Sequence, residues 1–451
     1  MSGSLPQADG SRARKALPIV LLTLFLDLLG FSILFPIFAE MMLYYQNRGD
    51  PLLLWSMEQL RSVLPDASDE RLAAFFGGIV LGVYAILQFI TAPLWGRLSD
   101  RIGRRPVLLV TTVGNLLGYL IWCVSGWFVV LLLGRVVNGI AAGNLSTLTA
   151  AAADCSTPAK RTRVMGAVGA TFGAGFLFGP AIGGIAYSVL PSMDGWGWGL
   201  NAFSGMAIVA AALTALNLLI IWRWFAETLP PQERGEREAP AIPPTVARGV
   251  RPLHLAYFIF MVGFTTMELA IVFMVKDLLG FGPSQTAWLF VAIGTTSILI
   301  QGGVVRRCAH RIPDAVFVTT GLLVVIIGLM LLALVGWWQV GWLAFTGGIV
   351  VAMGSALVMP GMSSWVSKLA PAHVQGATLG RLRSLGALAR VVGPFGCAIL
   401  YFAMGASAPF TVAAILTCIP VILVAWVVPR PQVEDTAADA QLPVTTVGEV
   451  P

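Results

Sequence analysis

Long apolar segments separated by short polar ones make up most of this chain. Each apolar segment has about 20 residues or more, and a helix of that length crosses a hydrocarbon core of about 30 Å. Twelve such segments occur, at residues 17–44, 73–95, 107–125, 128–153, 164–190, 200–224, 254–275, 286–305, 315–335, 340–366, 376–404 and 409–428. Because a bilayer offers no water to bond the backbone, each segment is predicted to be a helix.

The predicted helices fall into two sets of six, joined by a polar segment rich in Pro, Glu and Arg. We therefore expect five regions: a cytoplasmic N-terminal segment at 1–16, a six-helix bundle at 17–224, a flexible cytoplasmic linker at 225–253, a second bundle at 254–428 and a disordered cytoplasmic tail at 429–451. The loop at 45–72 is expected to carry a short amphipathic helix around SMEQLRSVL.

The two halves show an internal repeat. Gly166 is followed 13 residues later by a Gly-Pro pair at 179–180, and Gly380 is followed at the same distance by a Gly-Pro pair at 393–394. Both sets lie in the fifth predicted helix of their half. Duplicated bundles of this kind are typical of secondary transporters, which bind substrate between the repeats near the membrane midplane.

Composition and charge support a membrane protein with a fixed orientation. Of the 451 residues, 57% are hydrophobic, more than a soluble chain can bury. Of the 28 Lys and Arg, 22 lie on the side that carries both termini, which predicts cytoplasmic termini and a multi-pass protein of the plasma (inner) membrane. The remaining six are Arg48, Arg61, Arg71 and Lys276 on the opposite side, and Arg135 and Arg390 within helices. The net charge of +6 is thus explained by topology, and nucleic acid is not an expected partner.

Enzyme chemistry finds no support in the sequence. The three histidines lie near helix ends, no GxxxxGK[ST] phosphate loop occurs, and the five cysteines lack metal-like or paired spacing. No cofactor or metal is expected.

Three motifs resemble those of a known transporter family. GRLSDRIGRRPVLL, beginning at Gly96, is similar to the signature loop between helices two and three of the major facilitator superfamily. GRVVNGIAAG in helix four places Arg135 at the arginine of the family's proton-associated motif. Helix five matches the pattern of drug:proton antiporters at Gly166, Gly175, Gly179, Pro180, Gly183 and Gly184. The chain therefore resembles twelve-helix drug:proton antiporters, and the stretch YAILQFITAPLWGRLSDRIGRRP is especially similar to tetracycline-type exporters.

This resemblance implies the all-α major facilitator fold, with two six-helix bundles that alternate in access. It implies that the bent helix-five seam prevents ion leak. The residues alone also allow a simpler interpretation, in which the glycines only permit close helix packing.

Charged residues inside membranes are costly and mark functional sites. Asp27 in helix one is the first candidate for the coupling proton, with Arg135 as its electrostatic modulator, although the two could instead form a fixed ion pair. Glu268 in helix seven is the second candidate, or a group that attracts a cationic substrate. Arg390 in helix eleven is expected to face a cavity or a helix contact, and pairs with Glu268 in one interpretation. An unpaired Arg390 would favour an anionic or zwitterionic substrate.

Neutral amides extend the predicted cavity. Gln88 and Asn138 are candidates for lining it, whereas Asn115 is expected to bond helices together. Tetracycline exporters carry acids in helices three and nine and a histidine in helix eight, and this chain has none there. A metal-chelated tetracycline is therefore not predicted.

The 96–106 loop has a second predicted role besides topology. Its members and their expected partners are Gly96, Asp100, Arg101, Gly103, Arg104, Arg105, Asp154, Arg161 and Arg163. Gly96 and Gly103 are expected to permit a tight turn. By resemblance, the charges form a cluster that stabilises the outward-open state and breaks when the cavity opens inward.

Two functions remain open from the sequence. The first is proton-coupled export of small amphipathic or drug-like molecules by a chain that works as a monomer in the lipid bilayer. The second is uptake or facilitated transport of a specific metabolite.

Overall fold

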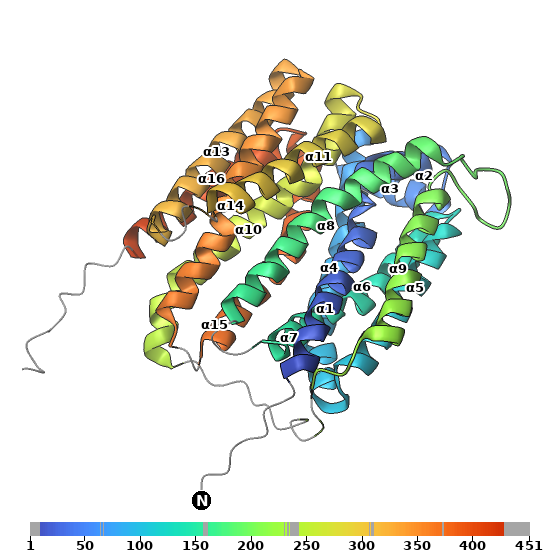
Figure 1. The fold of residues 1–451 in the computed structure, drawn as a ribbon. Helices are drawn as coiled ribbons and strands as arrows, with labels where there is room; N and C mark the ends of the chain where they lie inside the picture. Colours follow the sequence, from blue (N-terminus) through green and yellow to red (C-terminus); the bar gives the residue numbers. More distant parts are fainter. Residues whose placement is uncertain are drawn as a thin grey trace, which may run out of the picture.

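A computed structural model shows an all-helical architecture in the residues it describes, which are 10–63, 65, 67–156, 161–229, 231, 234, 243–305, 307, 311–371 and 374–427. Figure 1 shows its helices. Their bounds are α1 Gly10–Ser32, η1 Phe35–Ile37, α2 Phe38–Asn47, α3 Pro51–Val63, α4 Asp69–Ile102, α5 Arg104–Cys123, α6 Phe128–Ala141, η2 Ala142–Asn144, α7 Leu145–Asp154, α8 Arg161–Val189, α9 Ser204–Trp224, α10 Pro244–Leu279, α11 Pro283–Leu299, η5 Ile300–Val305, α13 Asp314–Trp338, α14 Gly341–Leu369, α15 Gln375–Met404 and α16 Ala408–Val427.

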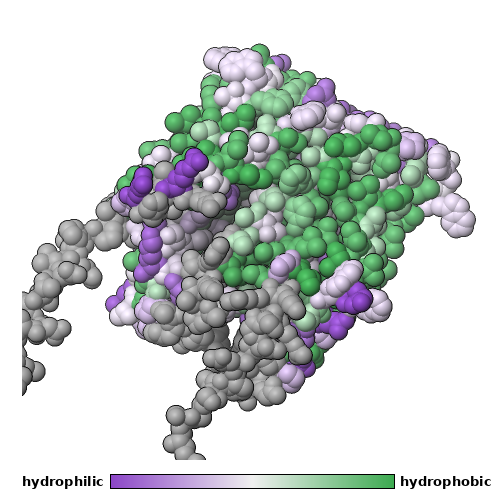
Figure 2. Space-filling model, in the orientation of Figure 1, coloured by the Kyte–Doolittle hydropathy of each residue, from purple (hydrophilic) through white to green (hydrophobic). Residues whose placement is uncertain are grey.

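Twelve helical segments are long and apolar enough to cross a membrane, as the sequence predicts. Three are interrupted: α1, η1 and α2 form the first, α6, η2 and α7 the fourth, and α11 and η5 the eighth. The helices up to α9 gather on one side of the molecule and those from α10 onward on the other (Figure 1). Hydrophobic residues cover the middle of the surface, with hydrophilic ones toward the ends (Figure 2). The protein is therefore an integral membrane protein built from two bundles.

The internal repeat extends to individual hydrogen bonds. In the N-terminal half, the Ser32 hydroxyl of α1 donates to the carbonyl of Gly175 in α8 (2.9 Å). In the C-terminal half, the Thr265 hydroxyl of α10 donates to the carbonyl of Ala389 in α15 (3.1 Å). Gly175 and Ala389 are separated by the same 214 positions as the two Gly-Pro pairs. The same inter-helix bond thus occurs at equivalent places in both halves.

Several predicted helix ends are wrong. α4 continues to Ile102 and α5 begins at Arg104, so only Gly103 separates them, with a φ of +106° that favours glycine. Gly96 lies inside α4 and forms no turn. Arg and Asp continue a helix readily, so their polarity did not mark its end. α10 likewise begins at Pro244, within the predicted linker.

Other boundary predictions have different outcomes. The short helix expected in the 45–72 loop is present as α3. Residues 1–9, 235–242 and the predicted tail at 429–451 lie outside the described residues.

The two halves meet through α4 with α15 and through α8 with α11. We call the end of the bundle where α4 meets α5 the basic end, and the other the opposite end. Toward the opposite end, rings of the two halves pack at centroid distances of 5.8 Å for Phe35 and Phe290 and 5.3 Å for Phe75 and Phe402.

Ion pairing and packing differ between the ends. At the opposite end, Lys276 Nζ of α10 lies 2.5 Å from Glu40 Oε2 of α2. At the basic end, α7 packs against α1, α4, α5 and α8, and η5 against α11 and α14, all within their own halves. Among the described residues, these ring contacts and this ion pair between the halves lie at the opposite end.

Candidate functional site

A cavity lies between the two halves, on the basic side of those contacts. Helices of both halves contribute to it. Its polar and charged lining residues are Asp27, Gln88, Asn115, Asn144, Thr265, Glu268 and Arg390. Its aromatic lining residues are Phe31, Phe35, Tyr84, Tyr119, Phe172 and Phe176. The cavity thus combines few charges with broad apolar walls, as ligand sites do.

Asp27 is held by two amides that the sequence analysis did not identify. Its Oδ2 accepts a hydrogen bond from Asn144 Nδ2 (3.0 Å), and its Oδ1 accepts one from Asn217 Nδ2 of α9 (2.9 Å). Both carboxylate oxygens are therefore oriented by neutral donors of the N-terminal half. The only available signal was an asparagine within an apolar segment, which does not reveal its partner.

The helix break at η2 places Asn144 beside Asp27. Breaking a helix leaves carbonyl groups without intrahelical partners. α4 supplies donors: Gln88 Nε2 bonds the carbonyl of Ala142 (3.2 Å), and Trp95 Nε1 bonds that of Ile140 (2.7 Å). Gln88 therefore lines the cavity, as predicted, and also donates a hydrogen bond to a carbonyl at the break in the helix.

Arg135 does not reach Asp27. Among the described residues, no ion pair or hydrogen bond joins them, and Arg135 is 1% exposed with its guanidinium 5.3 Å from the Trp122 ring centroid. Its Nε and Nη2 have no hydrogen-bond partner within the described part of the protein. The alternative of a fixed Asp27–Arg135 pair is therefore wrong for this conformation, because the two side chains lie at different depths.

Asn138 lies between helices and not on the cavity wall. It donates to the carbonyl of Asn115 (2.9 Å), and a Cβ on Gly118 would approach within 2.3 Å of its amide. The prediction that Asn138 lines the cavity is therefore wrong, and helix bonding explains it. Asn115, predicted only to bond helices, also borders the cavity.

Glu268 and Arg390 both border the cavity without a direct ion pair between them in the described structure. Arg390 instead lies over the Phe172 ring, 5.8 Å from its centroid. Since Phe172 belongs to α8 and Arg390 to α15, this cation–π contact joins the two halves beside the cavity. Arg390 remains the cavity's candidate for contacting an anionic group.

The antiporter-motif glycines pack α8 against its neighbours. A Cβ would lie 2.5 Å from Leu28 at Gly175, 1.8 Å from Ser32 Oγ at Gly179 and 2.3 Å from the carbonyl of Ile33 at Gly183.

The same motif also reaches the other half. At Gly184 a Cβ would lie 2.2 Å from Ala287 of α11. Close packing therefore explains these four positions, and Pro180 lies in the same helix. The surroundings of Gly166 lie outside what the structure describes.

Arg104 is the centre of a buried charge cluster at the basic end. It contacts Asp100 (2.7 Å), Asp154 (3.0 Å) and Ser99 Oγ (2.6 Å), and is 2% exposed. Glu227, which the sequence analysis missed, accepts from the backbone N–H of Arg104 (2.8 Å) at the N-terminus of α5. The predicted charge cluster is thus present.

The release of this cluster when the cavity opens inward stays a prediction. Asp100, Asp154 and Ser99 belong to the N-terminal half and Glu227 to the segment that follows α9, and these contacts are present while the rings of the two halves pack at the opposite end. Motion of one half as a unit would leave it intact. Arg101 is exposed, and Arg105 donates to the carbonyl of Trp222 (2.5 Å). The side chains of Arg161 and Arg163 lie outside the described part.

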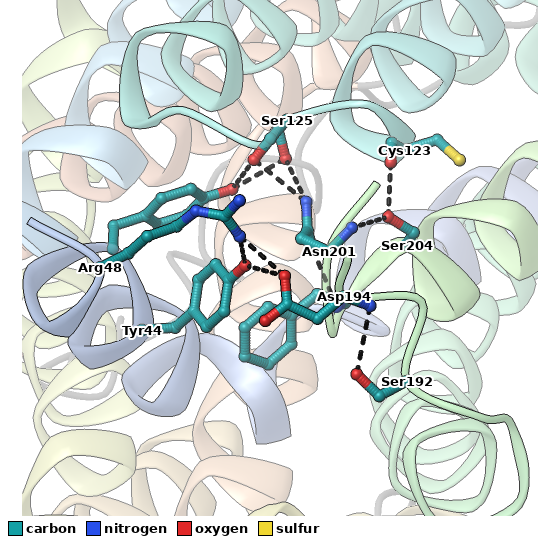
Figure 3. A network of polar contacts seen from close by, with 10 residues as sticks. Tyr44, Arg48, Cys123, Ser125, Ser192, Asp194, Asn201 and Ser204 are labelled. Atoms are coloured by element: carbon teal, nitrogen blue, oxygen red, sulfur yellow. Dashed lines mark hydrogen bonds and ion pairs between the residues drawn. The ribbon is translucent and has the colours of Figure 1, made fainter. Parts of the chain in front are cut away.

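A polar network at the opposite end joins the α8–α9 loop to the C-terminal end of α2 and to the α5–α6 loop (Figure 3). The Ser125 carbonyl accepts from Tyr45 Oη (2.5 Å) and Asn201 Nδ2 (3.0 Å). Arg48 pairs with Asp194 at 2.7 Å, and this hydrogen bond raises the pKa of the Arg48 guanidinium. The network holds one half together, unlike the Glu40–Lys276 pair.

Comparison with known proteins agrees with this architecture. Residues 20–394 match the family model of the Major Facilitator Superfamily. Major facilitator superfamily domain-containing protein 10 of Bos taurus is 32% identical over 435 residues, covering 90% of this chain and 91% of the relative. The class D tetracycline resistance protein of Salmonella ordonez is 28% identical, covering 91% and 96%.

Solved structures give the same result. The crystal structure of the human organic anion transporter MFSD10 aligns with a TM-score of 0.72 at 30% identity, over 91% of this chain and 99% of that one. The D-xylose-proton symporter aligns with a TM-score of 0.70 at 13% identity, over 92% and 97%, which shows a shared fold.

Proposed function

The chain belongs to the Major Facilitator Superfamily, whose members are transporters and not enzymes, and we propose that it exports amphipathic organic anions in exchange for protons. The observation that carries this proposal is the separation of charges in the cavity. Asp27 is bound by two neutral amides of the N-terminal half, whereas Arg390 lies on the C-terminal half without an ion-pair partner among the described residues.

Each group then has one task. Asp27 carries the proton, because its carboxyl borders the cavity and its hydrogen-bond partners are neutral amides, so no ion pair holds it in the charged form. Arg390 receives the anionic group of the substrate, while Phe31, Phe172 and Phe176 contact its apolar body. A relative described as an organic anion transporter supports this substrate class. Arg135 modulates the electrostatic field around Tyr84 and Tyr119 without touching Asp27.

Topology and assembly complete the proposal. The excess of Lys and Arg at the basic end supports a cytoplasmic position for that end and for both termini, and with it an inward-facing state of the cavity in a plasma-membrane protein. Both halves of one chain line the cavity, which supports a functional monomer.

A second candidate, transport of a zwitterionic metabolite without proton coupling, has one observation in its favour. Glu268 and Arg390 border the same cavity without bonding each other, so a ligand with both charges could bridge them.

Proteoliposomes distinguish the two candidates. Vesicles loaded with naphthalene sulfonate, a permanent anion, should release it when the outside is acidified, and a naphthyl-trimethylammonium ion should not be released. Asp27→Asn should abolish this proton-driven flux while sulfonate–sulfonate exchange continues, and Arg390→Gln should abolish both. Proton-driven flux that persists in Asp27→Asn would exclude Asp27 as the proton carrier, and release of the cation alone would exclude the proposed substrate class.

A further inference from the structure

A shallow apolar groove runs along the lipid-facing surface between α5 and α9. Its walls consist of Leu109, Val110 and Val113 from α5 and Ala215, Leu218, Leu219 and Trp222 from α9. Val110, Leu219 and Trp222 are exposed in the isolated chain. Both helices belong to the N-terminal half, so the groove is separate from the transport cavity.

The groove, together with the turn of α5 that carries Arg105, fits within one leaflet of a bilayer. From Arg105 to Val113 the helix rises about 12 Å at 1.5 Å per residue. Half of a hydrocarbon core of about 30 Å is about 15 Å. α5 begins and α9 ends at the basic end, so the groove lies in the leaflet on that side.

Two arginines lie where the groove reaches the basic end. Arg105 precedes Leu109 by one helical turn, and Arg223 follows Leu219 by one turn, so each shares a helix face with a groove residue. The Arg105 guanidinium is held there by its bond to the carbonyl of Trp222 (2.5 Å). Arg223 is exposed and lies over the Trp224 ring, 5.9 Å from its centroid.

The contacts described for these two guanidinium groups are with the carbonyl of Trp222 and the ring of Trp224, and neither contact is an ion pair. The nearby acid, Glu227, accepts hydrogen bonds from the backbone N–H groups of Arg104 and Arg105 (2.8 and 3.1 Å) and so occupies the start of α5. Two positively charged side chains therefore lie at the end of the apolar groove nearest the membrane surface, at the depth of the lipid headgroups.

We propose that this groove binds an anionic glycerophospholipid, with one acyl chain between α5 and α9 and the phosphate beside Arg105 and Arg223. A zwitterionic lipid with the same chains fits the groove equally but gains less from the arginines, because its headgroup has no net charge. The bound lipid would fix α9 against α5 at the membrane surface.

Native mass spectrometry of the detergent-purified chain tests this site. The protein is titrated with phosphatidylglycerol or with phosphatidylcholine of identical acyl chains. An arginine near a lipid surface contributes about a fivefold change in affinity. The double variant Arg105→Gln, Arg223→Gln should therefore bind phosphatidylglycerol about 25-fold more weakly and lose its preference over phosphatidylcholine.

Two further variants make the result specific. Arg248→Gln, Arg251→Gln removes the same charge from exposed positions of α10, in the other half, and should leave phosphatidylglycerol binding unchanged. Val110→Trp fills the groove with the arginines intact and should weaken both lipids. Equal loss in the α10 variant, or unchanged binding in either groove variant, would overturn the proposal.

Discussion

The two ends of the molecule hold charge in opposite ways. At the basic end, Arg104 and Asp154 are 2% and 4% exposed and belong to one half of the protein. At the opposite end, Glu40 and Lys276 are 33% and 27% exposed and belong to different halves. The Arg104–Asp154 pair lies within one half, which is expected to move as one body. The Glu40–Lys276 pair lies across the surface where the two halves separate.

This difference distinguishes an ion pair that stabilises the fold from one that can affect the opening of the molecule. A buried pair is costly to break by removing one partner, because the other charge stays buried without compensation. A partly exposed pair contributes little, because water can replace either partner. We therefore expect the motif at 96–106 to stabilise the N-terminal half, and the Glu40–Lys276 pair to open and close during transport.

The largest expected effect comes from breaking the buried cluster. Arg104→Ala should lower the free energy of unfolding by about 3–5 kcal/mol, because it removes a buried guanidinium that contacts Asp100, Asp154 and Ser99 at once. Thermal unfolding in detergent, followed by tryptophan fluorescence, measures this loss. Asp100→Ala removes a partner that is 37% exposed and should cost about 1 kcal/mol or less. Equal losses in both variants would contradict the distinction.

Glycine-to-alanine substitutions in α8 should have smaller effects, and these effects should differ between packing within one half and packing between the two halves. Gly179→Ala brings a methyl group against Ser32 of the same half and should destabilise the fold by about 1–3 kcal/mol. Gly184→Ala meets Ala287 of the other half and should instead widen the distance between spin labels placed on α8 and α11. Both quantities are measured for each variant.

A matched control exists in the same helix. Gly169 has nothing within 4 Å of an added Cβ, so Gly169→Ala should change neither the stability nor the distance. A loss of stability in Gly184→Ala as large as in Gly179→Ala would contradict the distinction between packing within one half and packing between the halves.

The sequence predicted the fold well because the bilayer sets the length of each helix and the repeat relates the halves. It predicted Asp27, Glu268, Gln88 and Arg390 at the cavity, because charged and amide groups stand out within apolar segments. Its resemblance to the family's signature loop also predicted that Arg104 and Asp100 belong to one cluster.

Contacts between distant helices could not be predicted in this way. Asn144 and Asn217 hold Asp27, yet a neutral amide in a helix carries no signal of its partner. Glu40 and Lys276 meet only because α2 and α10 are brought together by the packing of the two halves. The end of α4 was missed because arginine and aspartate form helix beyond the membrane surface as readily as loop.

The smallest expected change in stability comes from the Glu40–Lys276 pair, whose effect should appear in conformation. Lys276→Met should alter the free energy of unfolding by less than about 1 kcal/mol. This attraction also favours the conformation in which the opposite end is closed. Its loss should therefore raise the population of molecules with an open opposite end by up to about fivefold. Double electron–electron resonance between spin labels on α2 and α10 measures the distance between these helices and so reports that population.

Two controls test whether the pair acts across the halves. The exchange Glu40→Lys with Lys276→Glu should restore the closed distance, because the attraction is retained with its charges reversed. Asp194→Asn breaks a pair of similar exposure on the same face, but within one half, and should leave the distance unchanged. If Asp194→Asn opened the molecule as much as Lys276→Met, the ion pair would have no special role at this interface. The opposite end would then be closed by the contacts of Phe35, Phe290 and their neighbours alone.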